Sequence, residues 1–147
     1  MIELARRVAP LMLLALGTVL VLPGVALGQS YLERVVEALR RDPVYVDANA
    51  ESNLDPAGAD RLRAAIDQAG TPVFVGILPD ATRNGADASV LVRAIGDRLG
   101  QRATVAVVAG NQFRAGSNVL PRGKAGTLAT AAIQAHREEG VESMLLD

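Results

Sequence analysis

A long apolar run lies near the start of the chain, over residues 8–22, and is broken at Pro23. Basic residues precede this run, and the small residues Ala26 and Gly28 follow it. A positive start, an apolar segment, a helix breaker and a small-x-small sequence form the order typical of a secretory signal. Residues 8–27 also reach the length of about 20 residues that a membrane-spanning helix needs. The pattern therefore predicts either a cleavable signal peptide or an uncleaved N-terminal membrane anchor.

Arg6 and Arg7 set the expected orientation of this segment. Positive residues beside an apolar segment stay on the cytoplasmic side, so the rest of the chain is expected on the other side. We expect residues 1–28 to be the signal or anchor and residues 29–147 to form a single extracytoplasmic α/β domain. The predicted location is the cell membrane, or outside the cell. If residues 1–28 stay attached, the cytoplasmic membrane is a partner of the protein.

Four later segments have apolar residues at helical spacing, and three of them are described first. Ser30 and Glu33 form a capping box, which predicts that the first helix begins at Ser30, and Pro43 ends it. The same spacing predicts a helix that ends at Gly100 and a last helix over residues 127–136, capped by its threonine.

The second predicted helix has the clearest ends. Asp55 followed by Pro56 is typical of an N-cap and the first helical position, and Gly70 is typical of a C-cap. Four apolar residues are expected to form the buried stripe of this helix: Leu62, Ala65, Ile66 and Ala69.

Short apolar runs at residues 44–46, 72–78 and 104–109 predict strands between these helices. Residues 110–111 are expected to turn the chain into a partner strand within residues 113–119. The runs at residues 72–78 and 104–109 are apolar on both faces, as expected for strands covered on two sides. Strands and helices that alternate in this order predict a three-layer α/β/α sandwich with a small, mainly parallel sheet. An N-terminal hydrophobic signal or anchor helix is expected to precede it.

Composition narrows the classes of function. The formal net charge is −1, and the part after residue 28 is still slightly acidic, which argues against a nucleic-acid partner. The chain has no cysteine and one histidine, His136, which excludes a cysteine nucleophile and argues against a zinc site. It also contains no G-x-S-x-G nucleophile motif. Arg122 and Lys124, just before the last predicted helix, suggest either solvent-exposed side chains or a modest basic patch.

Three polar residues follow the three parallel strands: Asp47, Asp80 and Asn111. Ligands of open parallel sheets lie at the carboxyl ends of the strands, so these residues are candidates for a ligand or cation site. Oxygen ligands of this kind suit Ca²⁺ or Mg²⁺ as a cofactor. The alternative interpretation is that they are ordinary turn and cap residues, whose side chains bond to nearby backbone.

The loop after the first strand is a weaker cation candidate. Its oxygen-bearing side chains recur at every second residue from Asp47 onward, adding Asn49, Glu51, Asn53 and Asp55. An EF-hand would need glycine at the sixth position and glutamate at the twelfth, where this chain has Ser52 and Gly58. The remaining alternatives are a looser calcium site and a solvated loop.

Four blocks carry a family resemblance: residues 42–47 (DPVYVD), 55–60 (DPAGAD), 71–80 (TPVFVGILPD) and 104–117 (TVAVVAGNQFRAGS). They resemble a group of small exported or membrane-associated actinobacterial proteins of unknown function. More distantly, residues 62–140 are similar in layout to the TPM domain, an extracytoplasmic α/β sandwich named for a thylakoid phosphatase-like protein. The TPM resemblance implies acid phosphatase activity or calcium binding, or roles in assembly near membranes.

These observations lead to two main expectations for function. A third is a subunit of a larger complex, assembled through a transmembrane helix if residues 8–27 stay attached. The first is an exported, membrane-associated α/β domain that acts as a non-catalytic binding or accessory module at the cell envelope, with an envelope protein as a partner. The second is a TPM-like, divalent-cation-dependent phosphatase or calcium-binding domain, in which Asp47 and Asp80 hold the cation. The lack of nucleophile, histidine-based and phosphate-loop motifs favours the first.

Overall fold

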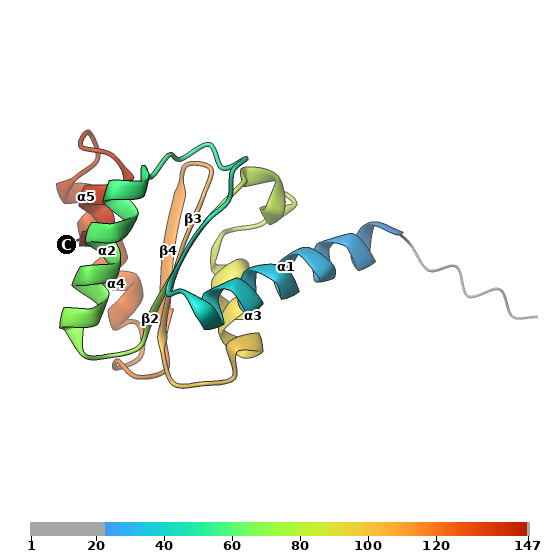
Figure 1. The fold of residues 1–147 in the computed structure, drawn as a ribbon, viewed down its shortest axis with the longest axis horizontal. Coiled ribbons are helices and arrows are strands. Elements are labelled where there is room, and N and C mark those ends of the chain that lie inside the picture. Colours follow the sequence, from blue (N-terminus) through green and yellow to red (C-terminus); the bar gives the residue numbers. More distant parts are fainter. Residues whose placement is uncertain (1–22, 147) are drawn as a thin grey trace, which may run out of the picture.

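The computed structural model describes residues 23–146 (Figure 1). The apolar run at residues 8–22, on which the predicted signal or anchor depends, lies outside these residues. Within residues 23–146, no helix is both long enough and apolar enough to cross a membrane.

A four-stranded sheet lies at the centre of the domain, in the order β1-β2-β3-β4. The first three strands are parallel, and β4 pairs antiparallel with β3 through a tight turn. This confirms the predicted α/β class with a mainly parallel sheet. The strands are β1 (Val44–Val46), β2 (Val73–Leu78), β3 (Thr104–Ala109) and β4 (Gln112–Ser117).

Helices cover both faces of this sheet (Figure 1). One face is covered by α1 (Pro23–Arg41) and α3 (Ser89–Leu99). The other is covered by α2 (Pro56–Ala69), α4 (Lys124–Ala135) and α5 (Val141–Leu146). A 3₁₀ turn, η1 (Asp80–Arg83), follows β2.

The central strands are apolar on both sides because both sides are buried. Along β3, Val105 and Val107 pack toward α1 and α3, whereas Ala106 and Val108 pack toward α2 and α4. All four are at most 7% exposed, so each layer has its own core cluster. The expectation that this strand lies between two layers of helices is confirmed.

The predicted ends of α2 are also confirmed. The Asp55 carboxylate accepts a hydrogen bond from the backbone N–H of Gly58 at 2.6 Å, and Pro56 opens the helix. Gly70 ends it in the left-handed region, with φ of 65°, which glycine adopts without steric cost.

Two predicted helix starts are wrong. The described part of α1 is already helical at Pro23, so Ser30 lies inside α1 and is not its N-cap. The last long helix begins at Lys124, after Gly123 with φ of 80°. Thr127 lies within it, and its hydroxyl donates to the Gly123 carbonyl at 3.1 Å, a bond typical of threonine inside a helix.

Candidate functional site

The three residues predicted to follow the strands lie at one edge of the sheet. Asp47 follows β1, Asp80 begins η1 after β2, and Asn111 lies in the turn between β3 and β4. The loop after β1 crosses this edge, because the Glu51 carboxylate accepts a hydrogen bond from the Asp80 N–H at 2.8 Å. The Ser52 hydroxyl likewise donates to the Gly110 carbonyl at 2.9 Å. The topology therefore brings these loops together as predicted.

Asp47 is a hydrogen-bond acceptor for three neighbours. One carboxylate oxygen accepts from the hydroxyls of Tyr31 at 2.7 Å and Tyr45 at 3.2 Å. The other oxygen accepts from the Asn49 N–H at 2.8 Å, which closes a local turn. Partial burial acts to raise the pKa of Asp47, but these hydrogen bonds outweigh it and hold the pKa below its usual value. Burial and the Asp47 carboxylate raise the pKa of Tyr31. Asp47 therefore joins α1 to the end of β1.

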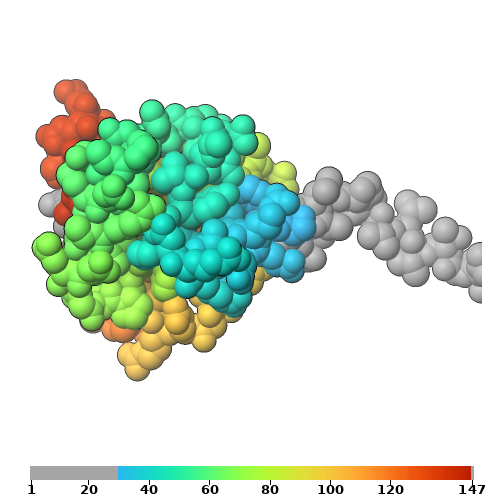
Figure 2. All heavy atoms as spheres, viewed as in Figure 1, coloured from blue at the N-terminus to red at the C-terminus, as the bar shows by residue number. Residues whose placement is uncertain are grey.

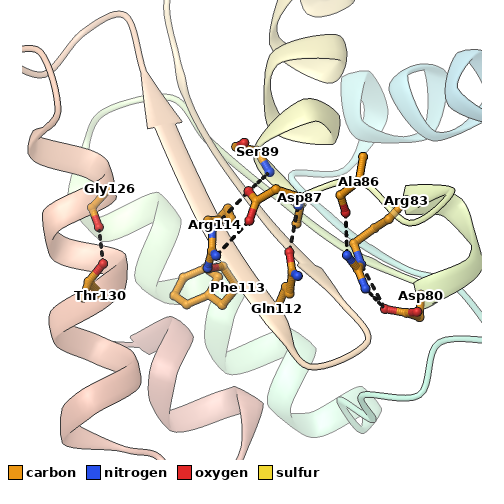
Figure 3. Close-up of polar contacts among 11 residues, drawn as sticks. Asp80, Arg83, Ala86, Asp87, Ser89, Gln112, Phe113, Arg114, Gly126 and Thr130 are labelled. Atoms are coloured by element: carbon orange, nitrogen blue, oxygen red, sulfur yellow. Dashed lines mark hydrogen bonds and ion pairs between the residues drawn. The ribbon is translucent and has the colours of Figure 1, made fainter.

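Asp80 is paired with a neighbour on the same 3₁₀ turn. One of its oxygens accepts from the Arg83 guanidinium at 2.9 Å and 2.6 Å (Figure 3). Arg83 also donates to the Ala86 carbonyl, so the pair fixes the loop that leads to α3. Gly110, with φ of 59°, passes so close to Asp80 that a Cβ there would overlap the carboxylate. These contacts are those of a turn residue in a packed loop.

The weaker cation candidates have local roles as well. Asp55 caps α2, Glu51 bonds to the backbone of Asp80, and the side-chain amide of Asn49 bonds to Asp47 at 3.3 Å. Asn53 lies in the loop before α2. Across residues 23–146, no group of three or more acidic, histidine or cysteine side chains gathers where a metal ion could bind.

The surface that stands out chemically is on the face of the sheet covered by α2 and α4. A groove of about 390 Å³ runs between α2 and α4 over the sheet, and we call it the α2–α4 groove. Its two long walls are formed by Leu62, Ala65, Ile66 and Ala69 of α2, and by Ala125, Leu128, Ala129 and Ala132 of α4.

Exposed leucines mark the groove. Leu120 is 38% exposed, Leu128 49% and Leu146 41%, and all three line it. Val90 on α3, at 52%, is the one other large apolar side chain of the described residues that is comparably exposed. Single exposed apolar residues are common, but several gathered in one concave surface are typical of a binding site.

The α5 helix bridges the two walls of the groove. It packs against both α2 and α4, and the Glu142 carboxylate accepts two hydrogen bonds from Arg61 of α2, at 2.5 Å and 2.9 Å. The segment that contains α5 lies beside α2 on the surface (Figure 2). Met144 and Leu145 of α5 line the groove beneath this contact and are half-buried.

Sequence reasoning did not find this groove. It assigned the stripe of α2 to the core, but only Leu62 is buried, whereas Ala65 and Ile66 are half-buried and Ala69 is exposed. The usable signal was the alanine content of the inner faces of α2 and α4, because alanines are too short to fill the space between two helices.

No protein-family model, curated protein or solved structure matches this chain. The function is therefore inferred from the residues of the chain itself. Among the described residues, the α2–α4 groove is the surface whose composition departs furthest from an ordinary solvated face.

Proposed function

We propose that this protein is an exported, membrane-associated α/β domain that acts as a non-catalytic binding module at the cell envelope. Its binding surface is the α2–α4 groove. Residues 1–28 direct the domain across the membrane and attach it there if they are not cleaved.

One observation supports the binding role. Among residues 30–146, three of the four exposed large apolar side chains line one groove of about 390 Å³. Exposing this apolar surface to water costs free energy, at about 25 cal/mol for each Å². An occupant that covers Leu120, Leu128 and Leu146 recovers that free energy, which favours a binding role for the groove.

The course of α1 supports attachment near a membrane. The helix is continuous from Pro23 to Arg41, and its N-terminal end extends away from the sheet (Figure 1). Its other end is fixed in the core through Val35, Val36 and Leu39, each at most 2% exposed. A helix fixed in this way forms a stiff connection between the domain and the apolar segment that precedes it.

The phosphatase alternative would use Asp47 and Asp80. Both carboxylates already accept hydrogen bonds from neighbouring residues, and those bonds explain their positions without a cation. No contact among the described residues favours the enzyme over the binding module.

Single cysteines offer a direct test, because the natural chain has none. Val90→Cys and Leu128→Cys place a thiol at two helix positions of similar exposure, one distant from the groove and one within it. We expect a membrane-impermeant maleimide to label Val90→Cys in intact cells, since the domain lies outside. Leu128→Cys should react several-fold more slowly in cells than in the purified full chain, because its occupant shields the thiol.

The two variants separate the two parts of the proposal. If Val90→Cys reacts only after lysis, the extracytoplasmic location is wrong. If Leu128→Cys reacts as fast in cells as in the purified protein, the groove is unoccupied in the envelope and the binding role is wrong.

A further inference from the structure

We infer that the occupant of the α2–α4 groove is a free long-chain carboxylate, with its hydrocarbon chain in the groove and its carboxylate beside Arg122 and Lys124. This inference rests on the proposed binding role and names the ligand class. It follows from the shape of the groove, the chemistry of its lining and the charges at one of its ends.

The groove has one covered end and one open end. At the covered end, α5 lies across it and is held to α2 by the Arg61–Glu142 pair. At the open end, α2 finishes at Ala69, and Leu120 and Ala125 form the opposite wall. The antiparallel pairing of Thr104 with Ser117 places the loop before α4 at this open end.

The lining of the groove suits hydrocarbon. Its only polar side chains are those of Thr71 and Thr104, and the Thr104 hydroxyl is bonded to that of Ser117 at 2.9 Å. A peptide or a sugar would bury amides or hydroxyls that find no partners there, at a cost of about 1–3 kcal/mol for each group. A hydrocarbon chain has no such groups. Met144, an unbranched and flexible side chain at the covered end, can adapt to it.

The charge at the open end is positive. Arg122 precedes α4 and Lys124 is its first residue; both are exposed, and neither has an acidic partner within 4 Å among residues 23–146. Leu120, which lines the groove, is two residues before Arg122. Arg122 lines a hollow that adjoins the groove and shares Leu120 and Ala125 with it. Lys124 directly precedes Ala125, and Asp67, on the last turns of α2, lines neither the groove nor this hollow. An apolar groove that ends at two unpaired cations is complementary to a chain that ends in a single negative charge.

The test uses the full chain in phosphatidylcholine nanodiscs and three photoactivatable probes. These are a diazirine-bearing palmitic acid, the corresponding uncharged palmityl alcohol, and a phosphatidylcholine with the diazirine on its acyl chain. Labelled peptides are mapped by mass spectrometry. We expect the acid to label α2 and α4 more strongly than the alcohol or the phospholipid does.

Charge and groove variants make the result specific. In Arg122→Gln/Lys124→Gln, labelling of the groove by the acid should fall about threefold to tenfold, as expected for two exposed charge contacts, with labelling by the alcohol unchanged. Arg137→Gln is the matched control for charge. Leu128→Asn should lower labelling by both probes, whereas Val90→Asn should lower neither.

The experiment distinguishes an error in the inferred ligand from an error in the proposed binding role. If the acid and the alcohol label the groove equally, and the double variant changes neither, the inferred carboxylate is wrong while the apolar binding role stands. Equal or stronger labelling by the phospholipid would also overturn the free carboxylate. If no probe labels α2 or α4, the proposed binding role of the groove itself is wrong.

Discussion

The two faces of the sheet are packed in different ways. On the face covered by α1 and α3, the helices contact each other, and Val35, Leu39 and Ile95 are at most 1% exposed. On the other face, α2 and α4 stand apart as the walls of a groove, and α5 bridges them. We call these the closed face and the open face. The comparison suggests that the closed face provides stability and the open face provides binding.

Side-chain size explains the difference. On the closed face, α3 presents Leu91, Ile95 and Leu99 to the core, and these branched side chains fill the space toward α1. On the open face, the buried residues of α4 are alanines. Alanine lets α4 approach the sheet closely but leaves space toward α2 that no side chain of either helix fills.

The largest expected effect compares one leucine-sized side chain from each face. Ile95→Ala should lower the free energy of unfolding by about 2–5 kcal/mol, because it leaves a cavity at a fully buried site. Leu128→Ala should change it by no more than about 0.5 kcal/mol, since this side chain is half-exposed. Urea denaturation of both variants measures the contrast. Equal losses would show that the open face is as stabilising as the closed one.

The next largest effect is expected for the hydrogen bonds between Asp47 and two tyrosines, which join α1 to the end of β1 on the closed face. Asp47→Ala removes the acceptor of both tyrosine hydroxyls and should destabilise the protein by about 1–3 kcal/mol. Tyr31→Phe, which removes one donor, should cost about 1 kcal/mol. Thermal unfolding with EDTA and with millimolar calcium completes the test. A calcium-dependent rise in the wild-type melting temperature that Asp47→Ala abolishes would restore the cation-site hypothesis.

Local structure on both faces of the sheet could be predicted from the sequence more fully than the packing between the helices. The capping residues Asp55 and Gly70 and the apolar strands fix local structure by short-range rules, and those predictions are confirmed. Ser30 was misassigned because a capping box is a local signal, which does not show whether the residues before it are helical as well.

The candidate site shows the limit of such rules. Topology correctly placed the loops of Asp47 and Asp80 at one edge, yet the sequence could not show that Tyr31 and Arg83 bind these carboxylates. Periodicity shows which residues share a face of α2, such as Ile66 and Ala69. It does not show whether a second helix reaches that face, which depends on α4 and α5 at distant positions in the chain.

A smaller effect on stability is expected for the contact between α2 and α5, which covers one end of the groove on the open face. Arg61→Ala removes the exposed ion pair that holds α5 to α2, and exposed pairs contribute little to global stability. The urea midpoint should therefore change little, whereas backbone amides of α5 should exchange with solvent faster. Arg137→Ala, another exposed arginine, is the control. Unchanged exchange in α5 would show that its apolar contacts alone hold it over the groove.

The smallest expected effect is a pH dependence at the edge of the closed face, where Asp87 precedes α3 and contacts β4. The bonds from the Ser89 N–H at 2.9 Å and from Arg114 lower the pKa of Asp87 to about 2 (Figure 3). A carboxyl whose pKa is depressed by folding stabilises the protein above its unfolded pKa of about 4. This contribution is lost as the pH falls from about 4 to 2.

Asp87→Asn should thus be less stable than wild type at pH 6, with the difference vanishing near pH 2. Urea denaturation across this range, with a carbon NMR titration of the carboxyl, checks both the sign and the window. A constant difference between the two proteins from pH 6 to 2 would show that this ion pair does not help to hold α3 against the sheet.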